Sequence, residues 1–115
     1  MTLGVFLMRE RASDRFVPRR PVTVAFESKD SPRAYGVVAN LSEGGCCVWS
    51  DAHLKAGQKV TLAVSFARAS RPVPAPARVV WTGPGSKPGA SRYGVEFDAA
   101  AAEYFHLRRL ITESA

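Results

Sequence analysis

Asn40-Leu41-Ser42-Glu43-Gly44-Gly45 separates two runs of strand-like composition, Tyr35–Ala39 before it and Cys46–Trp49 after it. Short polar side chains such as those of Asn40 and Ser42 favour turns and can also bind a ligand. Two adjacent glycines allow positive φ angles and close approach of a partner. The stretch therefore predicts a polar turn between two strands, with side chains available to a ligand.

A basic segment, Arg15-Phe16-Val17-Pro18-Arg19-Arg20, lies about twenty residues upstream and is called the arginine segment below. It has no apolar periodicity and is followed by Pro21, so we expect an extended conformation. Antiparallel pairing of strands near 22–26 and 34–39 would bring Asn40 close to Pro21 and this segment. The three guanidinium groups and the polar turn are therefore predicted to form an anion site.

Alternation of apolar and polar residues predicts further strands in the runs Val22–Phe26, Val60–Phe66 and Tyr93–Phe97, and the run Ala77–Trp81 is expected to be another strand of the sheet. Six strands at short spacing indicate an all-β fold, a six-stranded antiparallel β-barrel. We expect the proline-rich run Arg68–Pro76 to be a loop, and a helix from about 98 to 112, with Asp98 as its N-cap, to pack across the barrel.

Length and composition favour one domain. The chain of 115 residues has a formal net charge of +6, which favours anionic partners. Residues 1–14 are predicted to be a mobile N-terminal arm, and residues 15–115 the barrel domain with its helix. Met8 is a second candidate for the biological start. The apolar residues Met1–Met8 are too few to cross a bilayer, so we expect neither export nor membrane insertion.

The pattern of reactive side chains argues against an enzyme. The two histidines lie in unrelated segments, and no glycine-rich phosphate loop or paired-carboxylate motif is present. We therefore predict no catalytic residues, metal site or cofactor. Cys46 and Cys47 are neighbours and point to opposite faces of a strand, which indicates reduced thiols and a cytoplasmic location.

Two motifs resemble those of the PilZ domain, a bacterial cyclic di-GMP receptor module. Arg15 and Arg19 fit its arginine-x-x-x-arginine element, and Asn40, Ser42 and Gly45 fit its (Asp/Asn)-x-Ser-x-x-Gly element. Two later runs, Arg78–Trp81 and Tyr93–Phe97, are similar to late strands of that family. The resemblance extends from about residue 15 to residue 111, and it implies a split-barrel fold of the PilZ type.

The resemblance implies that cyclic di-GMP is the ligand. The residues assigned to it are Arg15, Arg19, Arg20, Asn40, Ser42 and Gly45, with Gly44 and Trp81 as further candidates. Arginine forks would meet phosphate oxygens or the O6/N7 edge of guanine, and Asn40 would accept from the guanine N1 or N2 edge. Arg20 lies outside the family spacing and would be auxiliary. Trp81 could stack on guanine, but its place in an alternating strand favours the core.

The implied mechanism is closure of the arginine segment over the ligand, read by a separate protein effector that controls motility, attachment or exopolysaccharide. One alternative is a PilZ-like adaptor that does not bind nucleotide. Another is a small basic barrel that binds single-stranded nucleic acid. The second is disfavoured, because the aromatic residues Phe66, Trp81, Tyr93 and Phe97 are predicted to be buried. A split-barrel flavin enzyme has no residue evidence.

Overall fold

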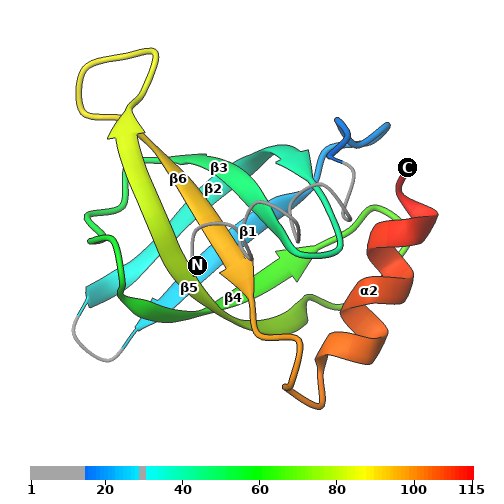
Figure 1. Ribbon diagram of the computed structural model, residues 1–115. Helices are drawn as coiled ribbons and strands as arrows, with labels where there is room; N and C mark the ends of the chain where they lie inside the picture. The colour runs from blue at the N-terminus through cyan, green and yellow to red at the C-terminus, as the bar shows by residue number, and fades with distance from the viewer. Residues whose placement is uncertain (1–14, 29–30) are drawn as a thin grey trace, which may run out of the picture.

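The computed structural model describes residues 15–28 and 31–115, which form a closed barrel of six antiparallel strands and a helix at one end (Figure 1). The elements are β1 (Thr23–Ser28), β2 (Ser31–Leu41), β3 (Gly45–Ser50), β4 (Lys59–Ser65), β5 (Val73–Pro84), β6 (Ser91–Phe97) and α2 (Tyr104–Glu113). Their order around the barrel is β1-β2-β3-β6-β5-β4, and β4 pairs with β1 to close it. The predicted fold class is confirmed. The predicted mobile arm, residues 1–14, lies outside the described residues.

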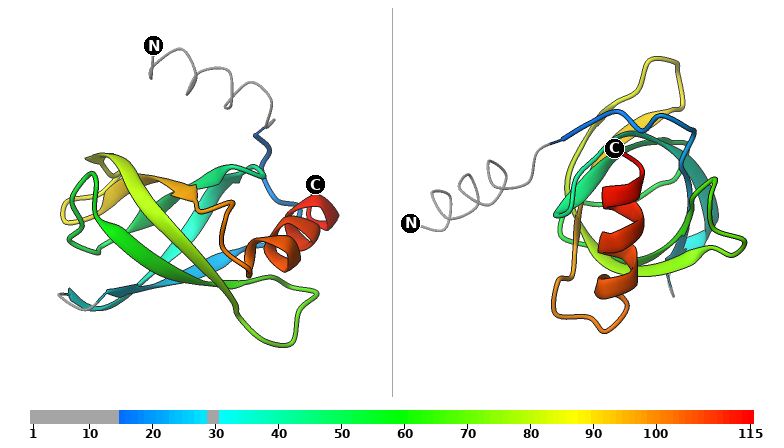
Figure 2. Two further views of the ribbon diagram at one scale, coloured as in Figure 1. Left: turned by 60° about the horizontal axis from the view of Figure 1, so that its bottom comes forward. Right: turned by 90° about the vertical axis from the view of Figure 1, so that its right-hand side faces the viewer.

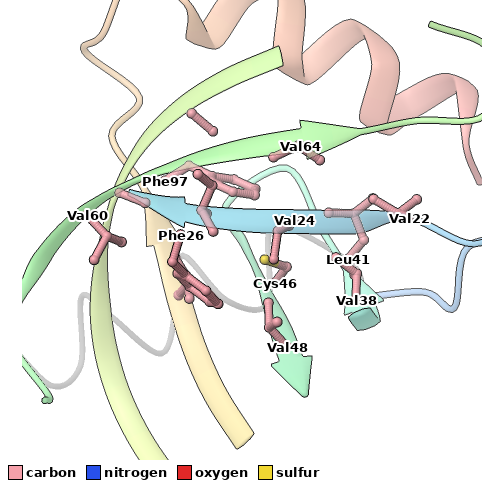
Figure 3. Packing of buried hydrophobic residues seen from close by; sticks show 14 of the residues in the cluster. Val22, Val24, Phe26, Val38, Leu41, Cys46, Val48, Val60, Val64 and Phe97 are labelled. Atoms are coloured by element: carbon pink, nitrogen blue, oxygen red, sulfur yellow. The ribbon is translucent and has the colours of Figure 1, made fainter. Parts of the chain in front are cut away.

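Alternating apolar side chains fill the barrel, as the periodicity predicts. Figure 3 shows Val24, Phe26 and Val48 pointing into the interior, where all three are buried. Phe26 meets the ring of Tyr93 edge to face, with the ring centroids 6.1 Å apart. The Tyr93 hydroxyl donates to the carbonyl of Ala52, which fixes the loop after β3. The interior is therefore a packed core, and ligands must bind elsewhere.

The helix α2 lies across one end of the barrel, as the end-on view in Figure 2 shows. Its buried residues Leu107, Leu110 and Ile111 belong to the same core as the strands. The predicted start of the helix is wrong, since α2 begins at Tyr104 and not at Asp98. The Asp98 carboxylate instead accepts from the Ala100 N–H at 3.0 Å, which closes a separate turn before the helix.

The proline-rich run is also not wholly a loop, because β5 begins at Val73 and includes Pro74 and Pro76. These prolines pair with β4, whereas pairing with β6 begins only at Ala77. The Pro76 carbonyl accepts from the Asp98 N–H, so the nitrogens of both prolines face the side that lacks a strand partner. A missing N–H costs nothing at such an edge, which explains why the strand tolerates them.

Two β-bulges change which face of the barrel certain side chains occupy. In β2 the register shifts between Val38 and Asn40, and in β5 it shifts between Val79 and Trp81. Strict alternation would place Asn40 and Trp81 inside with Val38 and Val79. The extra residue in each bulge turns both side chains outward instead. Asn40 therefore lies within a strand and not in the turn, and the prediction that Trp81 belongs to the core is wrong.

Candidate functional site

The bulges place four residues in one row across the outer surface of four adjacent strands. Asn40 of β2 lies opposite Cys47 of β3, Cys47 opposite Gly94 of β6, and Gly94 opposite Trp81 of β5. A Cβ atom on Gly94 would come within 2.0 Å of the Trp81 Nε1 atom, so the indole lies directly on the backbone of β6. We call these four residues the outer row.

Asn40 leaves a polar atom without a partner at one end of the outer row. Its Oδ1 atom is buried and accepts no hydrogen bond from any residue that the structure describes. Leaving such an atom unsatisfied costs about 1–3 kcal/mol. Such an acceptor could bind an N–H or O–H donor of a ligand once the groups that cover it move aside.

The turn between β2 and β3, residues 42–45, is fixed by its own hydrogen bonds. The Ser42 N–H donates to the Gly45 carbonyl at 2.8 Å, and the buried Ser42 hydroxyl lies 3.2 Å from both the N and the O atom of Gly45. Neither Gly44 nor Gly45 has a positive φ, contrary to the expectation from the sequence. Gly45 is needed for close approach, since a Cβ there would lie 2.0 Å from the Val95 carbonyl oxygen.

The same turn is tied to α2 through Glu43. The hydroxyl of Tyr104 donates to the Glu43 carbonyl at 2.8 Å, and the Arg108 guanidinium donates to the Glu43 carboxylate. Burial, followed by the charge of Glu43, raises the pKa of the Tyr104 hydroxyl, which therefore stays protonated as a donor. Arg108 and Glu43 lie 65 residues apart in the chain, so the sequence did not indicate this particular pairing.

The arginine segment makes an isolated antiparallel β-bridge with the end of β2, between Phe16 and Leu41. The N–H of Phe16 donates to the Leu41 carbonyl at 2.9 Å, and the N–H of Leu41 donates back at 2.8 Å. This confirms the predicted proximity of the segment to the polar turn. Its first arginine, Arg15, lies near the two cysteines: burial raises the pKa of the Cys47 thiol, and the charges of Arg92 and Arg15 act against that shift.

Arg19 and Arg20 lie apart from the other predicted ligand residues. Both are exposed, and both line a hollow beside the last residues of α2. Among the described residues, no hydrogen bond or ion pair joins either of them to Asn40 or Ser42. The structure thus groups Arg15, Asn40, Ser42 and Gly45 around the end of the β2–β3 hairpin, and leaves Arg19 and Arg20 at the barrel end.

Sequence reasoning missed a group of aromatic and basic side chains beside the outer row. The Arg92 guanidinium carbon lies 5.8 Å from the ring centroid of Trp49 and 5.9 Å from that of Trp81, within range of cation–π attraction. On the same outer surface, Arg33 lies 5.9 Å from the ring centroid of the exposed Tyr35. Alternation in β6 could have indicated that Arg92 points outward like Gly94, because Tyr93 and Val95 point inward on either side of Gly94.

Two further properties concern only residues 15–28 and 31–115. No group of three His, Cys, Asp or Glu side chains lies close enough to hold a metal ion. No helix in this part of the chain is both long enough and apolar enough to cross a bilayer.

Comparisons with known proteins agree with the barrel fold. The PilZ domain family matches residues 9–113. The PilZ domain of Escherichia coli YcgR, solved with c-di-GMP, superposes with a TM-score of 0.69 at 14% identity, covering 89% of this chain and 88% of that one. The PilZ domain of CeSA from a cellulose-synthesizing bacterium gives 0.61 at 20% identity, covering 88% and 97%.

A third solved structure, the inhibitor of motility MotI/DgrA of Bacillus subtilis, gives a TM-score of 0.67 at 16% identity and covers 89% of this chain. This chain spans about half of that protein, 48% of its length. No curated protein matches the chain in sequence. Since the family match covers nearly all 115 residues and the closed barrel agrees with it, the chain belongs to the PilZ domain family.

Proposed function

We propose that this protein is a cyclic di-GMP receptor that binds its ligand on the outer row and signals to a separate protein. Membership of the PilZ family supports the ligand, as does the YcgR domain that was solved with c-di-GMP. The proposed role is binding, with no bond of the ligand broken. A cytoplasmic location is part of the proposal and is supported by the free, buried thiols of Cys46 and Cys47.

The observation that carries the proposal is the unpartnered Oδ1 atom of Asn40. Guanine presents N–H donors at N1 and N2, which match an acceptor that has no donor of its own. Trp81, half-buried at the other end of the row, offers an indole ring on which a base can stack. The row thus combines one acceptor that reads the base edge with one aromatic surface that holds the base.

The arginines would supply charge to this row. Arg15 already lies beside Cys47 and is suited to a phosphate or to the O6/N7 edge of guanine. Arg19 would join it when the segment closes over the ligand, with Arg20 as an auxiliary contact. Ser42 would brace the turn, and Gly45, with its neighbour Gly44, would let the backbone approach the ligand.

Output would pass through α2. The helix touches both halves of the site, since Tyr104 and Arg108 bind Glu43 of the turn and Glu113 lies beside Arg19 and Arg20. Phe105 of α2 is 83% exposed and is available to an effector protein. Closure of the arginine segment would therefore change the surroundings of the helix that an effector can read. Motility, attachment and exopolysaccharide synthesis are the proposed outputs.

The decisive experiment is calorimetric titration of cyclic di-GMP into the wild type and into Asn40→Ala, with GTP as a competitor. We expect saturable binding in the wild type and loss of at least ten-fold in affinity in the variant. The variant should melt at the same temperature as the wild type or higher, because it removes a buried acceptor without a partner. Wild-type affinity in Asn40→Ala, or no heat in the wild type, would overturn the proposal.

A second candidate function is favoured by the outer aromatic residues, namely binding of single-stranded nucleic acid. Trp49, Trp81 and Tyr35 are interleaved with Arg33 and Arg92 on one surface, a composition typical of base-stacking platforms. Titration with a short single-stranded RNA at several salt concentrations separates the two functions. Tight RNA binding that weakens steeply with salt, without binding of cyclic di-GMP, would support this candidate. Heat from neither ligand would leave the adaptor that binds no nucleotide.

A further inference from the structure

A hollow of about 80 Å³ lies between the arginine segment and the end of α2. Its apolar lining comes from three buried residues of the core: Val22, Phe66 and Leu110. In Figure 2 the segment that follows residue 14, drawn in blue, runs past the end of the barrel close to the C-terminal end of α2. A single water needs about 10–15 Å³, so the hollow has room for a group the size of phosphate.

Three guanidinium groups surround this hollow. Arg19 and Arg20 come from the arginine segment, and Arg68 comes from the loop between β4 and β5. None of the three makes an ion pair or hydrogen bond with any residue in the described ranges. The hollow is also lined by Ala115 and by Glu113, whose carboxylate lies 3.5 Å from the Arg109 Nε atom. Three guanidinium groups without an ion-pair partner in the described ranges thus face a space in which the Glu113 side chain already has a partner.

Capping of α2 does not account for this arrangement. Cations often gather at the C-terminal end of a helix because its last carbonyls lack donors. Here the Ser114 N–H and hydroxyl donate to the carbonyls of Ile111 and Leu110, and the Thr112 hydroxyl donates to that of Arg108. The last turn is therefore capped from within the helix, and the arginines are left for another acceptor.

We propose that the hollow is a second anion site that binds the phosphate group of a small phosphorylated anion, with Arg68 completing a triad with Arg19 and Arg20. Arginine forks fit phosphate oxygens in bidentate fashion, and a bound dianion would relieve the mutual repulsion of the three charges. One consequence rests on the proposed function. An anion bound in the hollow would keep Arg19 at the barrel end, so the anion would compete with cyclic di-GMP.

The test uses pyrophosphate as the probe and needs no cyclic di-GMP. It is titrated by calorimetry into the wild type, Arg68→Ala and Arg71→Ala at a constant ionic strength set with sodium chloride. Arg71 is a matched control, because it is exposed in the same loop but does not line the hollow. We expect one site in the wild type and in Arg71→Ala, and affinity at least ten-fold weaker in Arg68→Ala. Equal binding in the two variants, or none in the wild type, would overturn the proposal.

Two further measurements keep the test independent of folding and of the proposed function. Melting curves would show whether Arg68→Ala is folded, and Arg68→Gln, which keeps most of the side-chain volume, replaces it if not. In the wild type, pyrophosphate should weaken cyclic di-GMP binding several-fold, and this effect should disappear in Arg68→Ala. Pyrophosphate binding without any cyclic di-GMP binding would support the second site while contradicting the receptor function.

Discussion

The two halves of the candidate site are held in place very differently. The turn at residues 42–45 has hydrogen bonds within itself, the carbonyl of Gly44 accepts from Phe97 at 2.9 Å, and Tyr104 binds the carbonyl of Glu43. The arginine segment is joined to the barrel by the two hydrogen bonds of Phe16, while Arg19 and Arg20 are exposed. The turn is thus fixed by the barrel itself, whereas the proposed closure concerns only the arginine segment.

This difference separates stability from affinity. Changes in the turn should lower the free energy of unfolding, because the turn is part of the barrel. Changes in the exposed arginines should lower affinity alone. Measuring both quantities for each variant tests whether the two halves differ in this way.

The largest effect is expected for Gly45→Ala. The new methyl group would lie 2.0 Å from the Val95 carbonyl oxygen, so β3 and β6 must separate. We expect a loss of about 3 kcal/mol in the free energy of unfolding, measured with urea. Gly83→Ala is the control, because its nearest neighbour beyond the adjacent residues is 3.7 Å away. Equal losses in both variants would show that the turn is no more constrained than any strand.

Arg19→Ala tests the other half of the site, the arginine segment. We expect the affinity for cyclic di-GMP to fall about 10- to 100-fold, the value of a charge-assisted hydrogen bond. The free energy of unfolding should change by less than about 0.5 kcal/mol, because the side chain is exposed. Arg71→Ala should change neither quantity. A clear loss of stability in Arg19→Ala would contradict the division into a fixed and an adaptable half.

Ser42→Ala removes the buried hydroxyl that braces the turn. It should cost about 1 kcal/mol of unfolding free energy, measured with urea, because the Gly45 N–H and carbonyl lose a side-chain partner. Ser70→Ala, in an exposed loop, is the control. If Ser42→Ala lost affinity without losing stability, the hydroxyl would act on the ligand and not on the turn.

The strand that follows the turn should make stability depend on pH. Burial, followed by the charge of Cys47, raises the pKa of the Cys46 thiol from 9.0 to about 12. Above pH 9 the unfolded chain loses this proton and the folded chain keeps it, so stability falls as pH rises. Between pH 7.5 and 9.5 we expect a loss of about 0.8 kcal/mol from this group. In Cys46→Ala the slope should be correspondingly flatter; an unchanged slope would assign the loss to other groups.

The smallest effect is expected for Tyr104→Phe, which removes the hydrogen bond between α2 and Glu43. We expect about 0.5 kcal/mol from urea unfolding, the lower end of the range for one hydrogen bond, because the site is partly exposed. Tyr35→Phe, with an exposed ring, should be neutral. Tyr104→Phe should also reduce any change that cyclic di-GMP produces in the hydrogen exchange of α2. An undiminished change would show that the helix responds through the arginine segment instead.

Much of the fold follows from period-two alternation, which is why six strands and the proximity of Asn40 to the arginine segment could be predicted. The outer row could not be predicted, because Asn40 and Trp81 each follow a bulge. The pattern of apolar residues does not reveal where a strand contains an extra residue. Prolines 74 and 76 misled the prediction because their edge position depends on where β6 ends. Arg68 and Arg108 were missed because their neighbours come from distant parts of the chain.

The bulges at Ala39 and Val80 also bear on how such a site is inherited. In each bulge one residue has no opposite partner, while Asn40 pairs with Cys47 and Trp81 with Gly94. Loss of the codon for Ala39 or Val80 would therefore give a regular strand that keeps Asn40 or Trp81 on the outer face. A slip of the strand pairing by one residue, with the chain length unchanged, would instead turn these side chains toward the core. In this family, therefore, a gap of a single residue at these positions is not expected by itself to separate binding from non-binding members.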